Sequence, residues 1–482
     1  MPTTHFPPPR LRAARSRLAF LPLVVLNLLF ATRCGDAVAS AEAGVGRTRA
    51  TSETVRVAAA ARAAGYEATA TTATATATTT TTTTTTTTPN TSLVLLPDNP
   101  YSAKCLDGSP PGYYFRAGTG EGQRKWHVFL AGGGWCLTGA DCQARSKTYL
   151  GSTKMYPSDP SNYSDVTWMK PGYDAILSTS PAANPTGHNW NLVRLIYCDG
   201  GGYAGTKGRV KLSAGTSIYL DGWNIFRAVV QDLRQNRCME APSDILLSGS
   251  SAGGQAVVNL CDWLAASFPN ATTRCLVDSG FFMDAKDRLG KHGFRLTAQS
   301  ITALHRPHNP NCTFAASSAQ QWKCFFPQYT LRSVATPVFI FHTLFDYIAA
   351  MLGNQLPRDN TTYAANCVRE VINNQNASAF EFIRLTKVSI AAAGTAAAVA
   401  GVSCKASEKE AVLGVASALH NQIVAIVSDR PSIGAYIPTS SVHTAATNRF
   451  WTTPWINGTS VSGAFESWSR NPPKDVAVLL HD

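Results

Sequence analysis

The chain has 482 residues, of which 44% are hydrophobic and 15% are charged, with ten tryptophans. This composition excludes a wholly disordered protein, a coiled coil and a polytopic membrane protein. The net charge is +12, but residues 1–67 hold nine arginines against four acidic residues and account for +5 of it. The remaining charge is spread without a basic run, a basic helix or zinc-finger spacing. We therefore expect a diffusely basic surface and no nucleic-acid partner.

The first residues have the three-part layout of a secretory signal peptide. Arginines at positions 10, 12, 15 and 17 precede an apolar run over residues 18–31, and Ala37-Val38-Ala39 offers a small-residue cleavage site. The run has 14 residues, which is short for a membrane span of about 20. Residues 1–39 are thus predicted to be a signal peptide of a secreted protein, with an uncleaved signal anchor as the alternative. No further membrane span is expected.

Residues 40–92 form an Ala/Thr-rich segment that ends in an unbroken threonine run over residues 78–88. The segment has no apolar period and cannot bury enough surface to offset its ordering entropy, so we predict a disordered linker. An O-glycosylated stalk and an unselected low-complexity expansion are both consistent with it. The globular domain is predicted to cover residues 93–482.

Cysteine usage and glycosylation motifs agree with an extracellular protein. Of the 12 cysteines, Cys34 would leave with the signal, so an odd number remains and at least one thiol stays free or pairs between chains. Secretion favours disulfides, although their connectivity is open. Seven N-x-[ST] sequons begin at asparagines 90, 162, 270, 311, 360, 376 and 457.

The globular part alternates short apolar runs with helical patterns. Four runs read as buried parallel strands: Trp126–Leu130, Leu192–Tyr197, Asp244–Leu247 and Val338–Phe341. Residues 221–234 have helical spacing, which gives an α/β fold with a mostly parallel central sheet flanked by helices. Residues 389–403 are small and featureless and are predicted to be a loop insertion. Ser407 and Glu410 predict a capping box for a helix over residues 408–427.

The strongest local motif is Gly249-Ser250-Ser251-Ala252-Gly253-Gly254, between a predicted strand and a predicted helix. Glycines around a tight strand-to-helix turn expose the Ser251 hydroxyl, and the helix N-terminus stabilises nearby negative charge. A serine hydroxyl needs a base and an orienting acid to become a nucleophile.

Candidates for these two partners follow Ser251 in the chain. Asp346 comes directly after a predicted strand, where a sheet presents side chains at its carboxyl edge. On position alone, a turn or helix-cap role is the favoured interpretation. His443 lies in a polar loop after the apolar stretch 435–438, and this position fits a surface histidine equally well. Six further histidines also follow the serine, at positions 292, 305, 308, 342, 420 and 481.

A tetrahedral intermediate also needs backbone N–H donors. Ala252, which follows the nucleophile, supplies one by geometry. Gly132-Gly133-Gly134-Trp135, directly after a predicted strand, can supply others because glycines let the chain approach a ligand closely. A plain glycine-rich loop is the alternative. The sequence has neither a P-loop lysine nor a G-x-G-x-x-G after a first strand, so no nucleotide site is expected.

Several motifs, in this order, resemble the pectin acetylesterase/Notum family. They are WHVFLAGGGWC (126–136), YCDG (197–200), LLSGSSAGG (246–254), CLVDSGFF (275–282), CFFPQ (324–328) and PVFIFHTLFD (337–346). The resemblance covers residues 95–470 and implies an α/β-hydrolase fold and ester hydrolysis without a cofactor or metal.

Carried over motif by motif, the resemblance assigns the nucleophile to Ser251, the acid to Asp346 and the base to His443. It assigns the oxyanion donors to the N–H groups of Gly134, Trp135 and Ala252. The chain departs from the family where Ser440 and Thr444 flank the histidine, since cysteines are usual there.

These features predict a secreted serine carboxylesterase that removes acetyl groups from an extracellular or cell-wall polysaccharide such as pectin, acting as a monomer. One alternative is a Notum-like esterase that removes a fatty acyl group from a protein. Another is an inactive glycan-binding or adhesion protein on the same fold, which the altered histidine loop keeps open.

Overall fold

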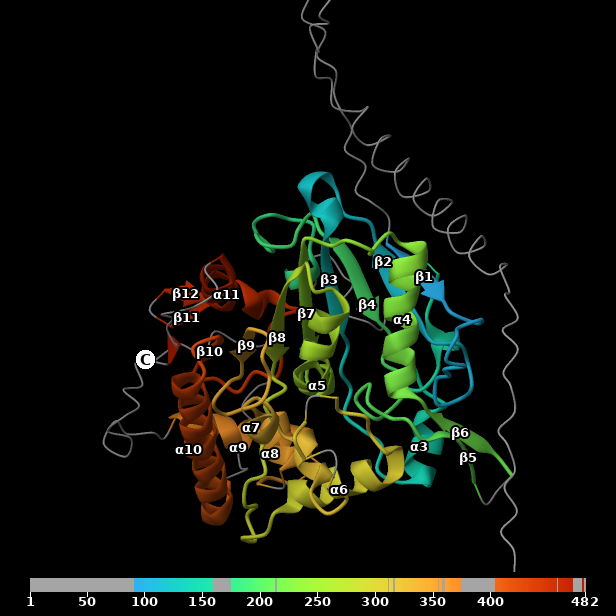
Figure 1. The fold of residues 1–482 in the computed structure, drawn as a ribbon. Helices are drawn as coiled ribbons and strands as arrows, with labels where there is room; N and C mark the ends of the chain where they lie inside the picture. The colour runs from blue at the N-terminus through green and yellow to red at the C-terminus, as the bar shows by residue number, and fades with distance from the viewer. Residues whose placement is uncertain are drawn as a thin grey trace, which may run out of the picture. The chain divides into compact units, whose positions relative to one another are not determined.

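A computed structural model of the chain describes residues 91–480, except 159–174, 213–214, 311, 315–316, 354, 358–359, 374–403, 457 and 471–478 (Figure 1). The predicted signal peptide, the Thr-rich run and the loop insertion at 389–403 lie outside the described residues.

The described residues form a nine-stranded sheet in the order β1-β2-β4-β3-β7-β8-β9-β10-β13 (Figure 1). Its strands are β1 (Ser92–Leu95), β2 (Gly112–Arg116), β3 (Lys125–Leu130), β4 (Asn191–Leu195), β7 (Asp244–Ser250), β8 (Thr272–Asp278), β9 (Val338–Phe341), β10 (Ile433–Ile437) and β13 (Leu479–Leu480). The strands from β4 to β13 in this order run parallel, whereas β1, β2 and β4 pair antiparallel at one edge. Two small antiparallel pairs are separate: β5 (Gly208–Lys211) with β6 (Ser217–Leu220), and β11 (Pro454–Ile456) with β12 (Thr459–Ser460).

Helices connect the parallel strands, as crossover connections require. The described α-helices are α3 (Gly139–Arg145), α4 (Gly222–Asn236), α5 (Ala252–Ser267), α6 (Gly293–His305), α7 (Pro327–Thr330), α8 (Tyr347–Leu352), α9 (Thr361–Asn373), α10 (Ala406–Asp429) and α11 (Val461–Arg470). Short 3₁₀ helices are η1 (Gly120–Arg124), η2 (Thr153–Met155), η5 (Ala175–Leu177), η6 (Gln321–Phe325) and η7 (Arg449–Trp451).

The α/β prediction is confirmed, including the mostly parallel sheet. All four predicted strands are present as β3, β4, β7 and β9, with ends that differ by up to three residues, and the predicted helix over 221–234 is α4. The antiparallel strands β1 and β2 were not predicted, because their sequences SLVL and GYYFR lack the polar–apolar alternation of an edge strand.

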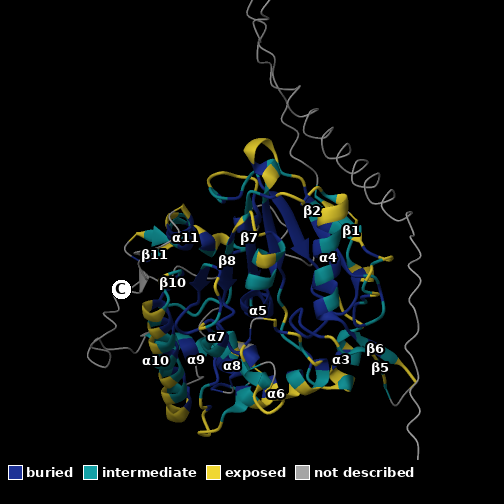
Figure 2. Ribbon diagram, in the orientation of Figure 1, coloured by how far each residue is buried: buried dark blue, intermediate teal, exposed yellow. Residues whose placement is uncertain are grey.

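The core lies on and around the central strands (Figure 2). Strands β4, β9 and β10 are buried along their whole length, as expected for parallel strands covered on both faces. Helix α5 packs against β3, β7 and β8 and buries Val257, Leu260 and Leu264 completely or almost so. Burying a side chain of this size contributes about 1.5–3 kcal/mol. This packing fixes the N-terminus of α5, where Ser251 lies.

Helix α10 corrects the predicted capping box. The helix begins at Ala406 rather than at 408, and the N–H of Lys405 donates to the Glu408 carboxylate at 3.2 Å. The Ser407/Glu410 pattern was wrong because tertiary bonds set the start: Cys404 is disulfide-bonded to Cys367, and its N–H donates to Glu370. Among the described helices, α10 is the one long and apolar enough to cross a membrane. It contacts β10, α7 and α9.

Five disulfides link described cysteines, as the cysteine usage predicted. They are Cys105–Cys198, Cys136–Cys142, Cys261–Cys275, Cys312–Cys324 and Cys367–Cys404. Cys238 is disulfide-bonded as well. Once the signal peptide with Cys34 is removed, an odd number of cysteines remains. That one of them is then free or paired between chains stays a prediction.

Candidate active site

The nucleophile candidate lies on the tight turn that the glycine motif predicted. Ser251 joins β7 to α5 with φ 57° and ψ −124°, a strained backbone conformation for a residue with a side chain. The turn leaves no room for larger neighbours: a Cβ at Gly253 would lie 2.1 Å from the carbonyl oxygen of Leu130. The N–H of Ser251 donates to the carbonyl of Asp278 at 2.8 Å, which ties the turn to β8.

Three predicted side chains meet at the carboxyl edge of the sheet. Ser251 Oγ lies 2.9 Å from Nε2 of His443, and Nδ1 of the same ring lies 2.6 Å from Oδ2 of Asp346. Asp346 follows β9 and begins α8, where its other carboxylate oxygen accepts the N–H groups of Ile348 and Ala349 at 2.9 and 3.0 Å. The structure thus brings together the serine, histidine and aspartate, which the sequence places up to 192 residues apart.

The charges around the imidazole favour proton uptake. Burial alone would lower the pKa of His443, but the carboxylates of Asp346 and Asp278 outweigh it and raise the pKa above its usual value. Burial opposes ionisation of Asp346, yet His443 and the Ala349 N–H hold its pKa below the usual range. The arrangement can therefore take a proton from the serine and stabilise the resulting imidazolium.

The glycine-rich segment after β3 passes over the serine turn. A Cβ at Gly132 would lie 2.9 Å from Cβ of Ser251 and 3.2 Å from the N atom of Ala252. Gly134 has φ +68° with nothing within 4 Å of its Cβ position, so backbone conformation rather than space favours glycine there. The indole of Trp135 is packed among Phe282, Phe294 and Phe325, with ring centroids 4.8 to 6.1 Å away.

Sequence reasoning missed a second buried carboxylate beside the triad. Asp278 ends β8, and its side chain accepts the Ser250 hydroxyl at 2.6 Å and the N–H groups of Ala445 and Ala446 at 3.0 and 3.1 Å. It thereby fastens the loop that follows His443 to the residue before Ser251. Burial raises the pKa of Asp278 despite these donors. In the sequence, Asp278 was indicated only by its place in the family motif CLVDSGFF. That motif does not reveal which groups the carboxylate binds.

The other candidate histidines have different surroundings. His342 lies behind the triad, 3.8 Å from Asp346, and burial lowers its pKa to about 4, so it is neutral. Nδ1 of His292 lies 2.8 Å from a carboxylate oxygen of Asp284, which is not a member of the triad. His305 lies beside the disulfide Cys136–Cys142. The ring of His308 lies against the ring of Trp223. His420 is part of helix α10, and His481 is outside the described residues.

Two groups of described residues are close enough together to hold a metal ion: Cys136, Cys142 and His305, and Cys367, Cys404 and Glu408. In each group the two cysteines are bonded to each other. A disulfide offers no thiolate, the form in which cysteine binds metals, so neither group has the donors of a metal site.

Comparisons with known proteins find one family model and several curated esterases that match this chain. A family model described as Pectinacetylesterase matches residues 84–478. Pectin acetylesterase 5 of Arabidopsis thaliana is 35% identical over 246 residues, 51% of this chain and 55% of that protein. Palmitoleoyl-protein carboxylesterase notum1' of Xenopus laevis is 26% identical over 398 residues, 79% of this chain and 68% of that protein. Palmitoleoyl-protein carboxylesterase NOTUM of Homo sapiens is 29% identical over 284 residues, 56% of this chain and 53% of that protein.

The matches to the plant relatives span little more than half of their length, whereas the family match covers most of this chain. The two kinds of relative are both named as esterases. The residues matched by the family model include the serine turn, the glycine-rich segment and the histidine loop. The chain belongs to the pectinacetylesterase family.

Proposed function

We propose that the protein is a secreted serine carboxylesterase with Ser251 as nucleophile, His443 as base and Asp346 as the orienting acid. The observation that carries the proposal is the continuous chain of two hydrogen bonds, 2.9 and 2.6 Å long, from the serine hydroxyl through the imidazole to the buried carboxylate. A binding protein has no need for a strained serine held against a histidine. The chain's complete triad therefore favours an enzyme over an inactive glycan-binding or adhesion protein, despite the missing cysteines beside His443.

The reaction proceeds in two halves through an acyl-enzyme. His443 Nε2 takes the proton from Ser251 Oγ as the oxygen attacks the ester carbonyl, and Asp346 stabilises the imidazolium. The N–H groups of Gly134, Trp135 and Ala252 bind the negative oxygen of the tetrahedral intermediate. The imidazolium then protonates the leaving alcohol. Water activated by the same histidine attacks the acyl-enzyme and frees the acid and the serine.

We further propose that the substrate is an acetylated extracellular polysaccharide, such as pectin. The relatives named pectin acetylesterases support this choice, since the plant proteins are 32–35% identical to the chain and the Notum proteins 26–30%. Removal of a fatty acyl group from a protein is the alternative, which the longer match to notum1' favours.

Secretion is part of the same proposal. The five disulfides among the described residues suit an oxidising compartment, and the first 39 residues have the layout of a signal peptide. An extracellular enzyme would meet a cell-wall polysaccharide directly.

Hydrolysis of p-nitrophenyl esters from acetate to palmitate by the secreted full-length chain tests the proposal. Ser251→Ala and His443→Ala are expected to abolish turnover, whereas Ser300→Ala, which changes an exposed serine on α6, is expected to leave it unchanged. Selectivity for acetate supports a deacetylase, and a preference for long chains supports lipid-ester removal. Folded wild-type protein without turnover on any ester, but with retained polysaccharide binding, would overturn the enzyme proposal.

A further inference from the structure

The segment Ala131–Cys136, which we call the oxyanion strap, is held on its carbonyl side by side chains. Tyr203 donates its hydroxyl proton to the carbonyl of Ala131 at 2.9 Å. Arg145 Nη2 donates to the carbonyl of Gly133 at 2.7 Å, and the hydroxyl of Tyr197 donates to that of Gly134 at 2.6 Å. The strap contains three consecutive glycines and has little conformational preference of its own, so these bonds decide how its peptide planes are turned.

The geometry of a trans peptide connects these bonds to the N–H groups on the other side. In a planar trans peptide the C=O of one residue and the N–H of the next point in opposite directions. A donor that holds the carbonyl of Gly133 therefore turns the N–H of Gly134 the opposite way, and a donor on the carbonyl of Gly134 does the same for Trp135. These are two of the three proposed oxyanion donors.

On this basis we propose that Arg145 and Tyr197 are positioning residues that orient the Gly134 and Trp135 N–H groups toward the developing oxyanion. The inference rests on the proposed esterase function. A hydrogen bond to each carbonyl also polarises the peptide, which strengthens the N–H on its far side as a donor. The donors are thus set before substrate binds and need no rearrangement during the reaction.

Tyr197 is built to donate in one direction. It follows β4 and is buried, and its oxygen accepts the N–H of Gly202 at 3.1 Å. Since one side of the hydroxyl already accepts a proton, its own proton is directed to the carbonyl of Gly134. Burial and Asp199 raise the pKa of Tyr197 above its ordinary value, so the phenol keeps that proton at any pH at which the protein would work.

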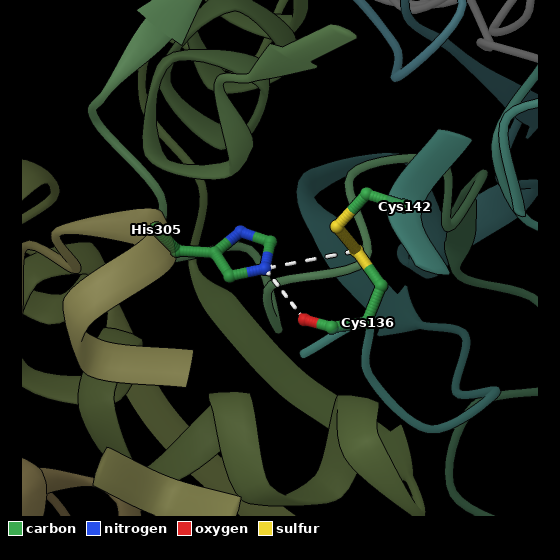
Figure 3. A group of neighbouring side chains, drawn as sticks. All are labelled: Cys136, Cys142 and His305. Atoms are coloured by element: carbon green, nitrogen blue, oxygen red, sulfur yellow. Dashed lines mark hydrogen bonds between the residues drawn. A yellow bond between two sulfur atoms is a disulfide. The ribbon is translucent and has the colours of Figure 1, made fainter. Parts of the chain in front are cut away.

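Helix α3 both carries Arg145 and is joined to the end of the oxyanion strap. Arg145 is the last residue of α3, and its guanidinium lies 5.2 Å from the centre of the Tyr197 ring. The disulfide Cys136–Cys142 joins the end of the strap to α3, and His305 Nε2 lies 3.0 Å from the carbonyl oxygen of Cys136 (Figure 3). Burial lowers the pKa of His305 to about 4, so this ring is neutral and can donate from Nε2.

Three single variants of the full-length chain test the proposal: Tyr197→Phe, Arg145→Met and Arg145→Lys. Removal of a whole oxyanion donor costs about 10²–10³ in kcat, and we expect misorientation of one donor to lower kcat/KM for p-nitrophenyl acetate by about 10- to 100-fold. Arg145→Lys, which keeps a charged donor, is expected to recover part of the loss. The double variant Tyr197→Phe/Arg145→Met is expected to lose less kcat/KM than the product of the two single-variant losses, because both hydrogen bonds orient the same strap.

The matched control is Tyr203→Phe. Tyr203 is as buried as Tyr197 and its hydroxyl binds the same strap, but the peptide it holds carries the N–H of Gly132, which is not a proposed oxyanion donor. The second readout is the inhibition constant of a trifluoromethyl ketone, whose carbonyl becomes a tetrahedral oxyanion when Ser251 Oγ adds to it. In the variants at Arg145 and Tyr197 this constant is expected to rise in parallel with the loss of kcat/KM, at unchanged thermal stability relative to Tyr203→Phe.

The outcomes separate this proposal from the proposed function. A wild-type protein that neither hydrolyses esters nor binds the ketone overturns both. An active wild type with Tyr197→Phe and Arg145→Met within threefold of it in both readouts overturns the positioning role alone, as does an equal loss in Tyr203→Phe. If Tyr197→Phe does not fold, Arg145→Met decides, because Arg145 is partly exposed.

Discussion

Replacement of Asp278 by asparagine tests how the histidine loop is held. The buried carboxylate accepts the Ser250 hydroxyl and the Ala446 N–H on one oxygen and the Ala445 N–H on the other. Asp278→Asn keeps the shape and one accepting oxygen, but presents an NH₂ group to a donor on the other side. The variant therefore loses the charge and at least one of the three bonds.

The expected cost follows from these contacts. A hydrogen bond to a charged group contributes about 1.5–3 kcal/mol, and a buried donor left without an acceptor costs about 1–3 kcal/mol. We expect Asp278→Asn to lower the free energy of unfolding by about 2–4 kcal/mol, which a domain with a stability of about 5–15 kcal/mol can tolerate. The negative charge of Asp278 helps to raise the pKa of His443. Its loss should therefore move the acidic limb of the pH–rate profile to lower pH.

Urea unfolding of the oxidised protein and kcat/KM for p-nitrophenyl acetate between pH 4 and 9 measure both effects. The matched control is Asp262→Asn on α5, because Asp262 also accepts two successive backbone N–H groups, those of Ala335 and Thr336, away from the triad. The control should leave the pH profile unchanged. Asp278 does not hold the histidine loop if the free energy of unfolding of Asp278→Asn lies within about 0.5 kcal/mol of wild type, as for a neutral surface substitution, and its pH profile is unshifted.

Further outcomes follow from the same contacts. Because its carboxylate neighbours raise the pKa of His443, wild-type kcat/KM should rise with pH through an apparent pKa above 6.5, the value for an ordinary histidine; a midpoint below 6 would contradict this. Loop entropy predicts that removal of the disulfide Cys105–Cys198 by paired serine substitutions costs about 5 kcal/mol and removal of Cys136–Cys142 about 2 kcal/mol. Activity assays beside urea unfolding should show the greater loss of kcat/KM for the second pair, which ends the oxyanion strap. Gly253→Ala should prevent secretion of folded protein, since its Cβ would lie 2.1 Å from a carbonyl oxygen. Gly414→Ala on α10, with open space around it, should instead stabilise the protein by about 0.5–1 kcal/mol; equal secretion of the two variants would refute the argument.

The parts of the site that depend on local pattern could be predicted from the sequence. The serine turn needs glycines within two or three residues of Ser251. The spacing of the apolar residues predicts the strand before the turn and the helix after it. The strap glycines are similarly local. Asp346 could be placed at the edge of the sheet because β9 is a short apolar run directly before it.

The parts that depend on distant segments could not be derived from the residues alone. His443 lies 192 residues from its serine partner and was singled out among seven histidines by resemblance to a family. The role of Asp278 comes from backbone N–H groups about 167 residues away, which no side-chain motif encodes. The start of α10 likewise depends on the bonds of Cys404, so its capping pattern misled.

The central claim is that Ser251 is a nucleophile activated by His443. Its most direct test is the reaction of the secreted protein with a fluorophosphonate, followed by peptide mass mapping. We expect one phosphonyl group per chain, on Ser251, with no label in Ser251→Ala and at least a hundredfold slower labelling in His443→Ala. A folded protein that stays unlabelled, or that carries the label on a different serine, would contradict the account.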